Sequence, residues 1–188
     1  MKIAISGLGS AGTTSTAKAV SERLGIALNT YTLRTLADDM QVDFEYMHAK
    51  AKKNDPSIDR LMDTQQIEFL HNNESGVVAS DLACWLDDSR IYKTLGLHQP
   101  TIDLKIWLNP SYEARAARFA SRHDGTSAGL AQYDQELIEH YKALYTIDIT
   151  DPTGIDWVFE TSTLDLQAVV DTITERATRL DSTSGPKD

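Results

Sequence analysis

The sequence predicts an α/β protein built on a parallel sheet with helices on both faces. Short apolar segments at residues 3–6, 77–79, 102–108 and 157–159 have the composition of buried strands, and stretches with helical spacing separate them. Strands that alternate with helices favour parallel pairing, because each crossover helix packs on a face of the sheet. The 188 residues suffice for one such domain with a buried core.

The first strand, at residues 3–6, leads through a glycine-containing turn into a helix. Ala17, Val20 and Leu24 share one face of that helix, and Gly25 follows the last of them. A glycine just past a helix adopts the left-handed backbone conformation without steric cost, so Gly25 is expected to end the helix.

Three helical stretches are expected before the second strand. Residues 33–40 have helical spacing, and Asp43 is a possible N-cap for a helix that extends to about residue 53. Pro56 begins another helix, whose apolar face continues to Phe69. The apolar strand at residues 77–79 comes next.

The second half of the chain repeats the alternation of strand and helix. Its expected elements are the strand 102–108, a helix capped by Asn109 and Pro110 that extends to about residue 123, a flexible loop at 124–129, a helix ending at Tyr145, the strand 157–159 and a helix with an apolar face from Leu166 to Ala177. Residues 181–188 are expected to form a disordered tail, so residues 1–180 make up the single domain.

Charge and cysteine content exclude several classes of protein. With 28 acidic and 18 basic residues the net charge is −10, which argues against binding of a nucleic-acid backbone. The single cysteine, Cys84, cannot form an intrachain disulfide and fits a reducing, cytoplasmic compartment. No apolar run approaches the roughly 18 residues that a membrane span needs, so no membrane partner is expected.

The turn after the first strand has the composition of a phosphate-binding loop. Glycines let successive backbone N–H groups turn inward around phosphate oxygens, and the N-terminus of the next helix adds partial positive charge. The hydroxyl of Thr14 is placed to coordinate Mg²⁺, whereas Thr13 stands where such loops usually carry lysine. A glycine-rich turn that binds nothing is the alternative. The candidate ATP-binding residues are Gly7, Leu8, Gly9, Ser10, Ala11, Gly12, Thr13 and Thr14.

Four segments, at residues 3–18, 55–63, 103–108 and 141–148, resemble the archaeal-type cytidylate kinase family among the P-loop nucleoside monophosphate kinases. Their order and spacing match the family to about Leu180. The resemblance implies a P-loop NTPase-type parallel sheet with helices on both faces and a small helical lid at about residues 121–140. It also implies transfer of the γ-phosphoryl group of ATP to CMP or dCMP, with Mg²⁺ as cofactor. Threonine in place of the loop lysine also occurs in that branch.

Arg115, Arg118 and Arg122 lie at i, i+3 and i+7, on one face of the predicted helix after Pro110. Phosphoryl transfer requires cations that stabilise charge on the phosphoryl oxygens. The resemblance assigns Arg118 and Arg122 to catalysis and Arg34 to the acceptor phosphate. A solvated basic stripe and a surface arginine are the respective alternatives.

Three carboxylates are further candidates. Asp59 and Asp63 lie one helical turn apart and match a family pair near the acceptor base, although a structural salt bridge explains them equally well. Asp81 follows the strand at residues 77–79 and is a candidate Mg²⁺ ligand of the Walker B kind. A helix N-cap or first-turn acid is the alternative for Asp81.

The chain departs from the family where the resemblance expects arginine: Asp81, Tyr133 and His140 stand there instead. We interpret His140 as a histidine on a helix surface. Because each change removes a charge that the chemistry uses, two alternatives remain open. One is a catalytically degenerate nucleotide-binding protein of the same fold, and the other is a small-molecule kinase with a different acceptor. In every case the expected partners are small-molecule nucleotides, and the expected state is a monomer or weak dimer.

Overall fold

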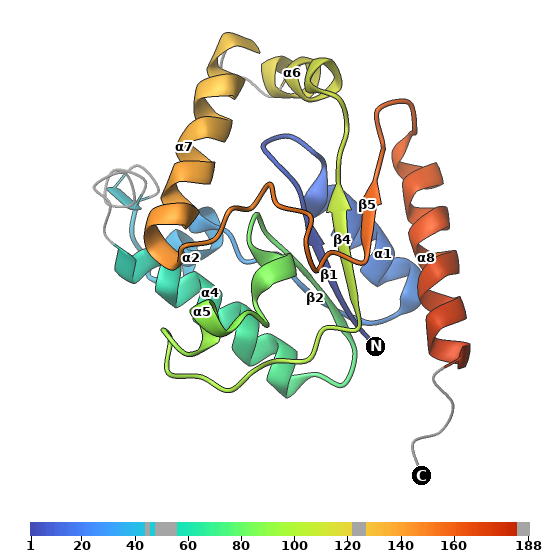
Figure 1. Ribbon diagram of the computed structural model, residues 1–188, viewed down its shortest axis with the longest axis horizontal. Helices are drawn as coiled ribbons and strands as arrows, with labels where there is room; N and C mark the ends of the chain where they lie inside the picture. Colours follow the sequence, from blue (N-terminus) through green and yellow to red (C-terminus); the bar gives the residue numbers. More distant parts are fainter. Residues whose placement is uncertain (44–45, 48–55, 122–126, 184–188) are drawn as a thin grey trace.

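The computed structural model describes residues 1–43, 46–47, 56–121 and 127–183. Its five strands form one parallel sheet in the order β2-β3-β1-β4-β5, with helices on both faces (Figure 1). The predicted fold class is therefore confirmed. The strands are β1 (Lys2–Ser6), β2 (Ala27–Asn29), β3 (Gly76–Ala79), β4 (Leu104–Leu108) and β5 (Trp157–Phe159).

The helices of the described residues cover the sheet in two layers. They are α1 (Thr13–Leu24), α2 (Leu33–Asp39), α4 (Pro56–Asn72), α5 (Ser89–Tyr92), α6 (Tyr112–Ser121), α7 (Ser127–Tyr145) and α8 (Leu166–Thr183), with a 3₁₀ helix, η1, at Ala83–Trp85. Two separate apolar clusters lie on opposite sides of β1. Ile3 and Ile5 pack with α1 and α8, whereas Ala4 packs with α4, η1 and α7. Burial on both faces explains why β1 is apolar at consecutive positions.

Several element boundaries differ from the prediction. Strand β2 was not predicted, because three half-buried residues at a sheet edge carry no periodic signal. Helix α6 begins after Asn109 and Pro110, and Ser111 Oγ accepts the N–H of Ala114 at 3.2 Å, so the serine caps the helix. The prediction of a loop at 124–129 is wrong for residues 127–129, which open α7.

The ends of two other predictions also shift. The prediction of a tail from residue 181 is wrong for residues 181–183, which complete α8, and residues 184–188 lie outside the described part. Asp43 Oδ1 accepts the N–H of Tyr46 at 3.3 Å, as expected of an N-cap, but most of the helix predicted to follow it lies outside the described residues.

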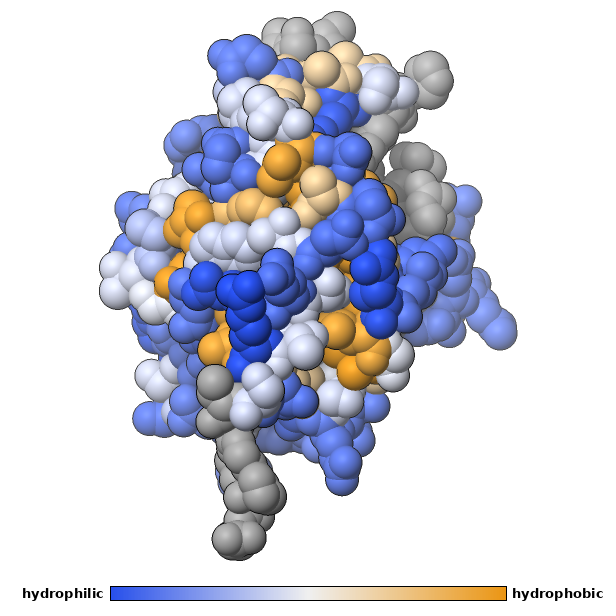
Figure 2. All heavy atoms as spheres, turned by 90° about the vertical axis from the view of Figure 1, so that its right-hand side faces the viewer, coloured by the Kyte–Doolittle hydropathy of each residue, from blue (hydrophilic) through white to orange (hydrophobic). Residues whose placement is uncertain are grey.

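The outer face that carries α8 is largely hydrophilic (Figure 2). In this view the hydrophobic areas are separated by hydrophilic ones. Leu166 and Leu180, the exposed large apolar residues of α8, lie near opposite ends of the helix. Within the described residues, no helix combines the length and apolarity that a bilayer-spanning segment requires.

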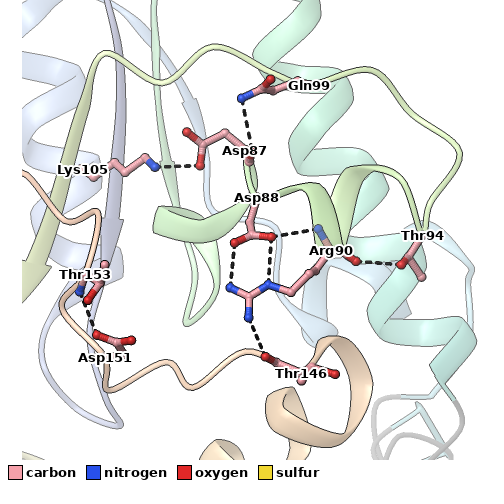
Figure 3. Close-up of polar contacts among 9 residues, drawn as sticks. All are labelled: Asp87, Asp88, Arg90, Thr94, Gln99, Lys105, Thr146, Asp151 and Thr153. Carbon is pink, nitrogen blue, oxygen red and sulfur yellow. Dashed lines mark hydrogen bonds and ion pairs between the residues drawn. The ribbon is translucent and has the colours of Figure 1, made fainter.

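The C-terminus of α7 ends on a residue with an unusual backbone conformation. Thr146 follows the helix with φ of 58°, in the left-handed region that disfavours β-branched side chains. Arg90 Nη1 donates to the Thr146 carbonyl oxygen at 2.7 Å, while the same guanidinium binds both carboxylate oxygens of Asp88 (Figure 3). This contact anchors the end of α7 to α5.

We expect Thr146→Gly to stabilise the protein by about 1 kcal/mol, because glycine adopts this conformation without the steric penalty. Thr146 is exposed, so little packing is lost. Urea unfolding of the two proteins measures the difference.

Gly25→Ala is the matched control. Gly25 has φ of 64° and open space around it, so alanine there adds backbone strain alone and should destabilise the protein. A lower free energy of unfolding for Thr146→Gly would contradict the assigned strain.

Candidate phosphate-binding site

The glycine-containing turn lies at the carboxyl end of β1, the edge of a parallel sheet where ligands bind in open α/β folds. Gly12 is the N-cap of α1 with φ of 96°, and its carbonyl oxygen accepts the N–H of Thr16 at 3.0 Å. A residue with a side chain rarely adopts that φ, so glycine is required where the loop turns into the helix. The loop therefore delivers its backbone directly to a helix N-terminus.

Helix α6 holds the outside of this loop through two arginines. Arg115 Nη1 donates to the Gly9 carbonyl oxygen at 3.1 Å, and Arg118 Nη1 donates to the Ala11 carbonyl oxygen at 3.2 Å. In a planar trans peptide the N–H of the next residue points opposite to the carbonyl. The N–H groups of Ser10 and Gly12 therefore point away from the arginines, which is the orientation that an anion-binding loop needs.

Arg118 also brings positive charge to the helix N-terminus. A Cβ placed on Gly12 would lie 3.9 Å from Arg118 Nη1, so the guanidinium is next to the loop. Arg122 lies outside the described residues. Arg34 is the second residue of α2, and its side chain is not among those described.

Sequence reasoning placed Arg115 on the basic face but missed its partner on α7. Arg115 Nη1 lies 2.7 Å from Asp134 Oδ2, and both residues are buried. Asp134 Oδ1 in turn accepts the N–H of Gly9 at 3.2 Å. The two charges are 19 residues apart on different helices, so no spacing rule connects them. Their opposite signs were the one available signal.

Tyr133 stands where the family resemblance expects arginine, and its ring takes up the space next to the loop. A Cβ on Gly9 would approach Tyr133 Cδ1 to 2.8 Å, so only glycine fits beneath the ring. The ring also packs against Phe119 of α6, with 6.2 Å between centroids. At this position the chain has an aromatic contact in place of a cation.

Asp81 lies just beyond β3 and is half-buried. Burial, reinforced by the Asp134 carboxylate, raises the pKa of Asp81 to about 6. The alternative of a helix N-cap is wrong, because Leu82 occupies the N-cap position of η1.

The side chains present fit a magnesium ion bound together with phosphates. The Asp81 carboxylate and the exposed Thr14 hydroxyl offer the hard oxygen ligands that Mg²⁺ prefers. The described residues contain no cluster of three or more histidine, cysteine, aspartate or glutamate side chains able to hold a metal by themselves. That donor set suits an ion that keeps several waters and relies on its substrate for the rest.

The two carboxylates predicted near the acceptor base connect α4 to α7. His140 Nε2 lies 3.2 Å from Asp59 Oδ1, and Tyr145 Oη donates to Asp63 Oδ2 at 2.6 Å. The interpretation of His140 as a surface histidine is wrong, because its side chain is 29% exposed and paired. Contact with the acceptor base stays a prediction for Asp59 and Asp63.

The pKa values of Asp63 and His140 are both raised in the folded protein. Burial raises the pKa of Asp63 to about 7, although the Tyr145 hydrogen bond partly opposes it. The Asp59 carboxylate raises the pKa of His140 above its usual value. The folded protein therefore holds protons at these two sites that the unfolded chain releases.

Comparison with solved structures defines the class of protein first. Deoxyadenosine kinase from M. mycoides with bound dATP superposes with a TM-score of 0.61 at 17% identity, covering 95% of this chain and 100% of that one. Shikimate kinase from Acinetobacter baumannii in complex with shikimate gives a TM-score of 0.59 at 14% identity, covering 99% and 95%. The fold, with its five-stranded parallel sheet and glycine loop, is that of the P-loop kinases.

Sequence comparison then gives the family. Cytidylate kinase from Archaeoglobus fulgidus is 31% identical over 180 residues, which is 92% of each chain. Cytidylate kinase from Pyrobaculum islandicum is 32% identical over 174 residues, or 89% of this chain and 88% of the relative. No family model matches the sequence. The chain belongs to the cytidylate kinase family, which confirms the predicted resemblance.

We expect Asp63→Asn to flatten part of the pH dependence of stability. A carboxyl group whose pKa rises from 3.8 to about 7 on folding makes the protein less stable as the pH rises through that interval. The amide resembles the neutral acid and keeps an oxygen for Tyr145. The stability of the variant relative to the wild type should therefore be higher at pH 8 than at pH 5, as measured by urea unfolding.

Asp148→Asn is the control for this measurement. Hydrogen bonds from Thr150 lower the pKa of Asp148, so its carboxylate is ionised at both pH values and the variant should shift both stabilities equally. Equal shifts at pH 5 and pH 8 for Asp63→Asn as well would contradict the assignment of a buried acid.

Proposed function

We propose that this protein transfers the γ-phosphoryl group of ATP to a nucleoside monophosphate, with CMP or dCMP as the acceptor. The orientation of the loop peptides carries the proposal. Carbonyl oxygens of Gly9 and Ala11 are held outward by arginines, and the amides of Ser10 and Gly12 point away from them, beside the N-terminus of α1. Membership of the cytidylate kinase family supports the choice of acceptor.

The roles of the individual residues follow from their positions. The loop from Gly7 to Thr14 cradles the donor phosphates, with the amides of Ser10 and Gly12 directed toward them. Thr14 and Asp81 would hold Mg²⁺, which when bound supplies charge neutralisation between the phosphates. Arg34 on α2 would bind the acceptor phosphate, and Asp59 and Asp63 on α4 would lie near its base.

The reaction forms a bond from an oxygen of the acceptor monophosphate to the γ-phosphorus and breaks the bond from that phosphorus to ADP. Negative charge increases on the leaving oxygen, so a cation near the loop stabilises the transition state. Thr13 supplies no charge, and the guanidinium of Arg118, next to Gly12, takes that role here together with Arg122.

The degenerate alternative has a specific observation in its favour. His140 stands at a position where the family resemblance expects a lid arginine, and the structure shows it already paired with Asp59. A histidine engaged in this way is not available to phosphate. This alternative predicts nucleotide binding without transfer, by a monomer or weak dimer that takes the same small-molecule partners.

A coupled assay of ADP release tests the proposed function. Purified protein is supplied with ATP, Mg²⁺ and each common nucleoside monophosphate in turn, and we expect the highest kcat/KM with CMP or dCMP. Calorimetric titration with ATP is run in parallel. Binding without turnover of any monophosphate would establish the degenerate protein, and turnover of a different metabolite alone would reassign the acceptor.

We expect Arg118→Met to lower kcat by about 100-fold, because under the proposed function it removes the cation that offsets charge developing in the transition state. Methionine keeps the apolar stem and removes only the charge and hydrogen bonds. The coupled assay at saturating ATP measures the effect.

Arg23→Met is the matched control for Arg118→Met. Arg23 forms an exposed pair with Asp171 of α8 at 2.8 Å. It lies in the last turn of α1, at the end opposite the loop, so loss of its charge should leave kcat unchanged. A kcat for Arg118→Met within threefold of the wild type would remove Arg118 from the catalytic machinery.

A further inference from the structure

Gly9 is bound by side chains at both of its backbone polar groups. Its N–H donates to Asp134 Oδ1 at 3.2 Å, and its carbonyl oxygen accepts Arg115 Nη1 at 3.1 Å. The same Arg115 nitrogen lies 2.7 Å from Asp134 Oδ2. The three contacts form a closed ring, which we call the Gly9 clamp, around one residue of the phosphate loop.

The clamp is buried. Arg115 and Asp134 are each 8% exposed, and the Tyr133 ring closes over Gly9. A buried pair of opposite charges is stabilising only when its remaining hydrogen-bonding groups also have partners. Here the Gly9 N–H is a partner for the Asp134 carboxylate, and the Gly9 carbonyl oxygen is a partner for the Arg115 guanidinium. Loss of either side chain would leave a charge buried without its partner, so the arrangement holds as a unit.

Helices α6 and α7 present the clamp as one body. Ala116 and Phe119 of α6 pack with Leu130 of α7 in a small apolar cluster of their own. In Figure 1, α6 lies above the loop that follows β1, and α7 descends beside it. The position of this helix pair therefore sets the orientation of the peptide between Gly9 and Ser10.

We propose that Asp134 is a positioning residue for the donor phosphates, acting through Arg115 and Gly9. In the clamp the Gly9 N–H binds Asp134 and is therefore not offered to the phosphates. The clamp fixes the peptide between Gly9 and Ser10 so that the Ser10 N–H points to the phosphate position. The charges of Asp134 and Arg115 cancel, so the clamp fixes the loop without adding net negative charge beside the phosphates. This inference rests on the proposed function, because it assigns the loop to ATP.

Asp134→Ala tests the clamp by calorimetric titration with ATP and by steady-state kinetics. We expect the Kd for ATP to rise about tenfold, as loss of one charge-assisted contact implies. The KM for the acceptor should stay within twofold. A purely structural loss would lower the active fraction and leave both constants unchanged.

Asp134→Asn keeps the size of the side chain and an oxygen for the Gly9 N–H, while it removes the ion pair. We expect its Kd for ATP to lie between those of the wild type and the alanine variant. This variant decides the question if Asp134→Ala does not fold.

Asp87→Asn is the control, because Lys105 and Asp87 form a similarly short pair of 2.7 Å, with side chains 17% and 18% exposed, and neither residue belongs to the loop or the clamp (Figure 3). It should lower the Tm without changing either constant. Amide hydrogen exchange of the ligand-free protein gives an independent readout, in which Gly9 is protected in the wild type and loses protection in Asp134→Ala.

An ATP Kd for the Asp134 variants equal to or lower than that of the wild type would overturn the proposal, since a lower value would mark Asp134 as a competitor of phosphate. An unprotected Gly9 amide in the wild type would overturn it as well. Absence of transfer by the wild type would end the proposed kinase activity while leaving the ATP titration readable, so the two failures are distinguishable.

Discussion

The shape of the loop between β1 and α1 depends on where its carbonyl oxygens find hydrogen-bond donors. A glycine-rich turn by itself has many accessible backbone conformations, and losing that freedom is costly. Here two arginines of α6 bind the Gly9 and Ala11 carbonyl oxygens from one side. The peptides are therefore ordered before a ligand binds, so the free energy of binding is not reduced by the entropy cost of ordering them.

The elements that the sequence predicted well are those whose signals are local. β1, the turn and α1 follow one another within 24 residues, and their apolar spacing, glycines and helix stop all lie within that stretch. The prediction of the turn as a phosphate-binding loop rested on its glycines and on its place between a strand and a helix. The short edge strand β2 has no such local pattern, and its pairing with β3 is what defines it.

The partners of the charged residues were harder to predict, because they are chosen by packing between helices. Spacing placed Arg115 and Arg118 on one face of α6, but only the docking of α7 selects Asp134 as the partner of Arg115. The docking of α7 against α4 likewise turns His140 toward Asp59. A charge pattern along one helix shows which side chains share a face and says nothing of the face opposite.

The substitution of threonine for the loop lysine is best understood together with the arginines of α6. A lysine in the loop would carry its charge on a flexible side chain, and that side chain would become ordered only when phosphate binds. Arg118 brings a planar cation from outside the loop and already spends one N–H on the Ala11 carbonyl oxygen. Its remaining donors keep a fixed direction, because the guanidinium is rigid. The same contact thus orients the loop amides and places a cation next to Gly12. Under the proposed function, that cation compensates for the neutral side chain of Thr13.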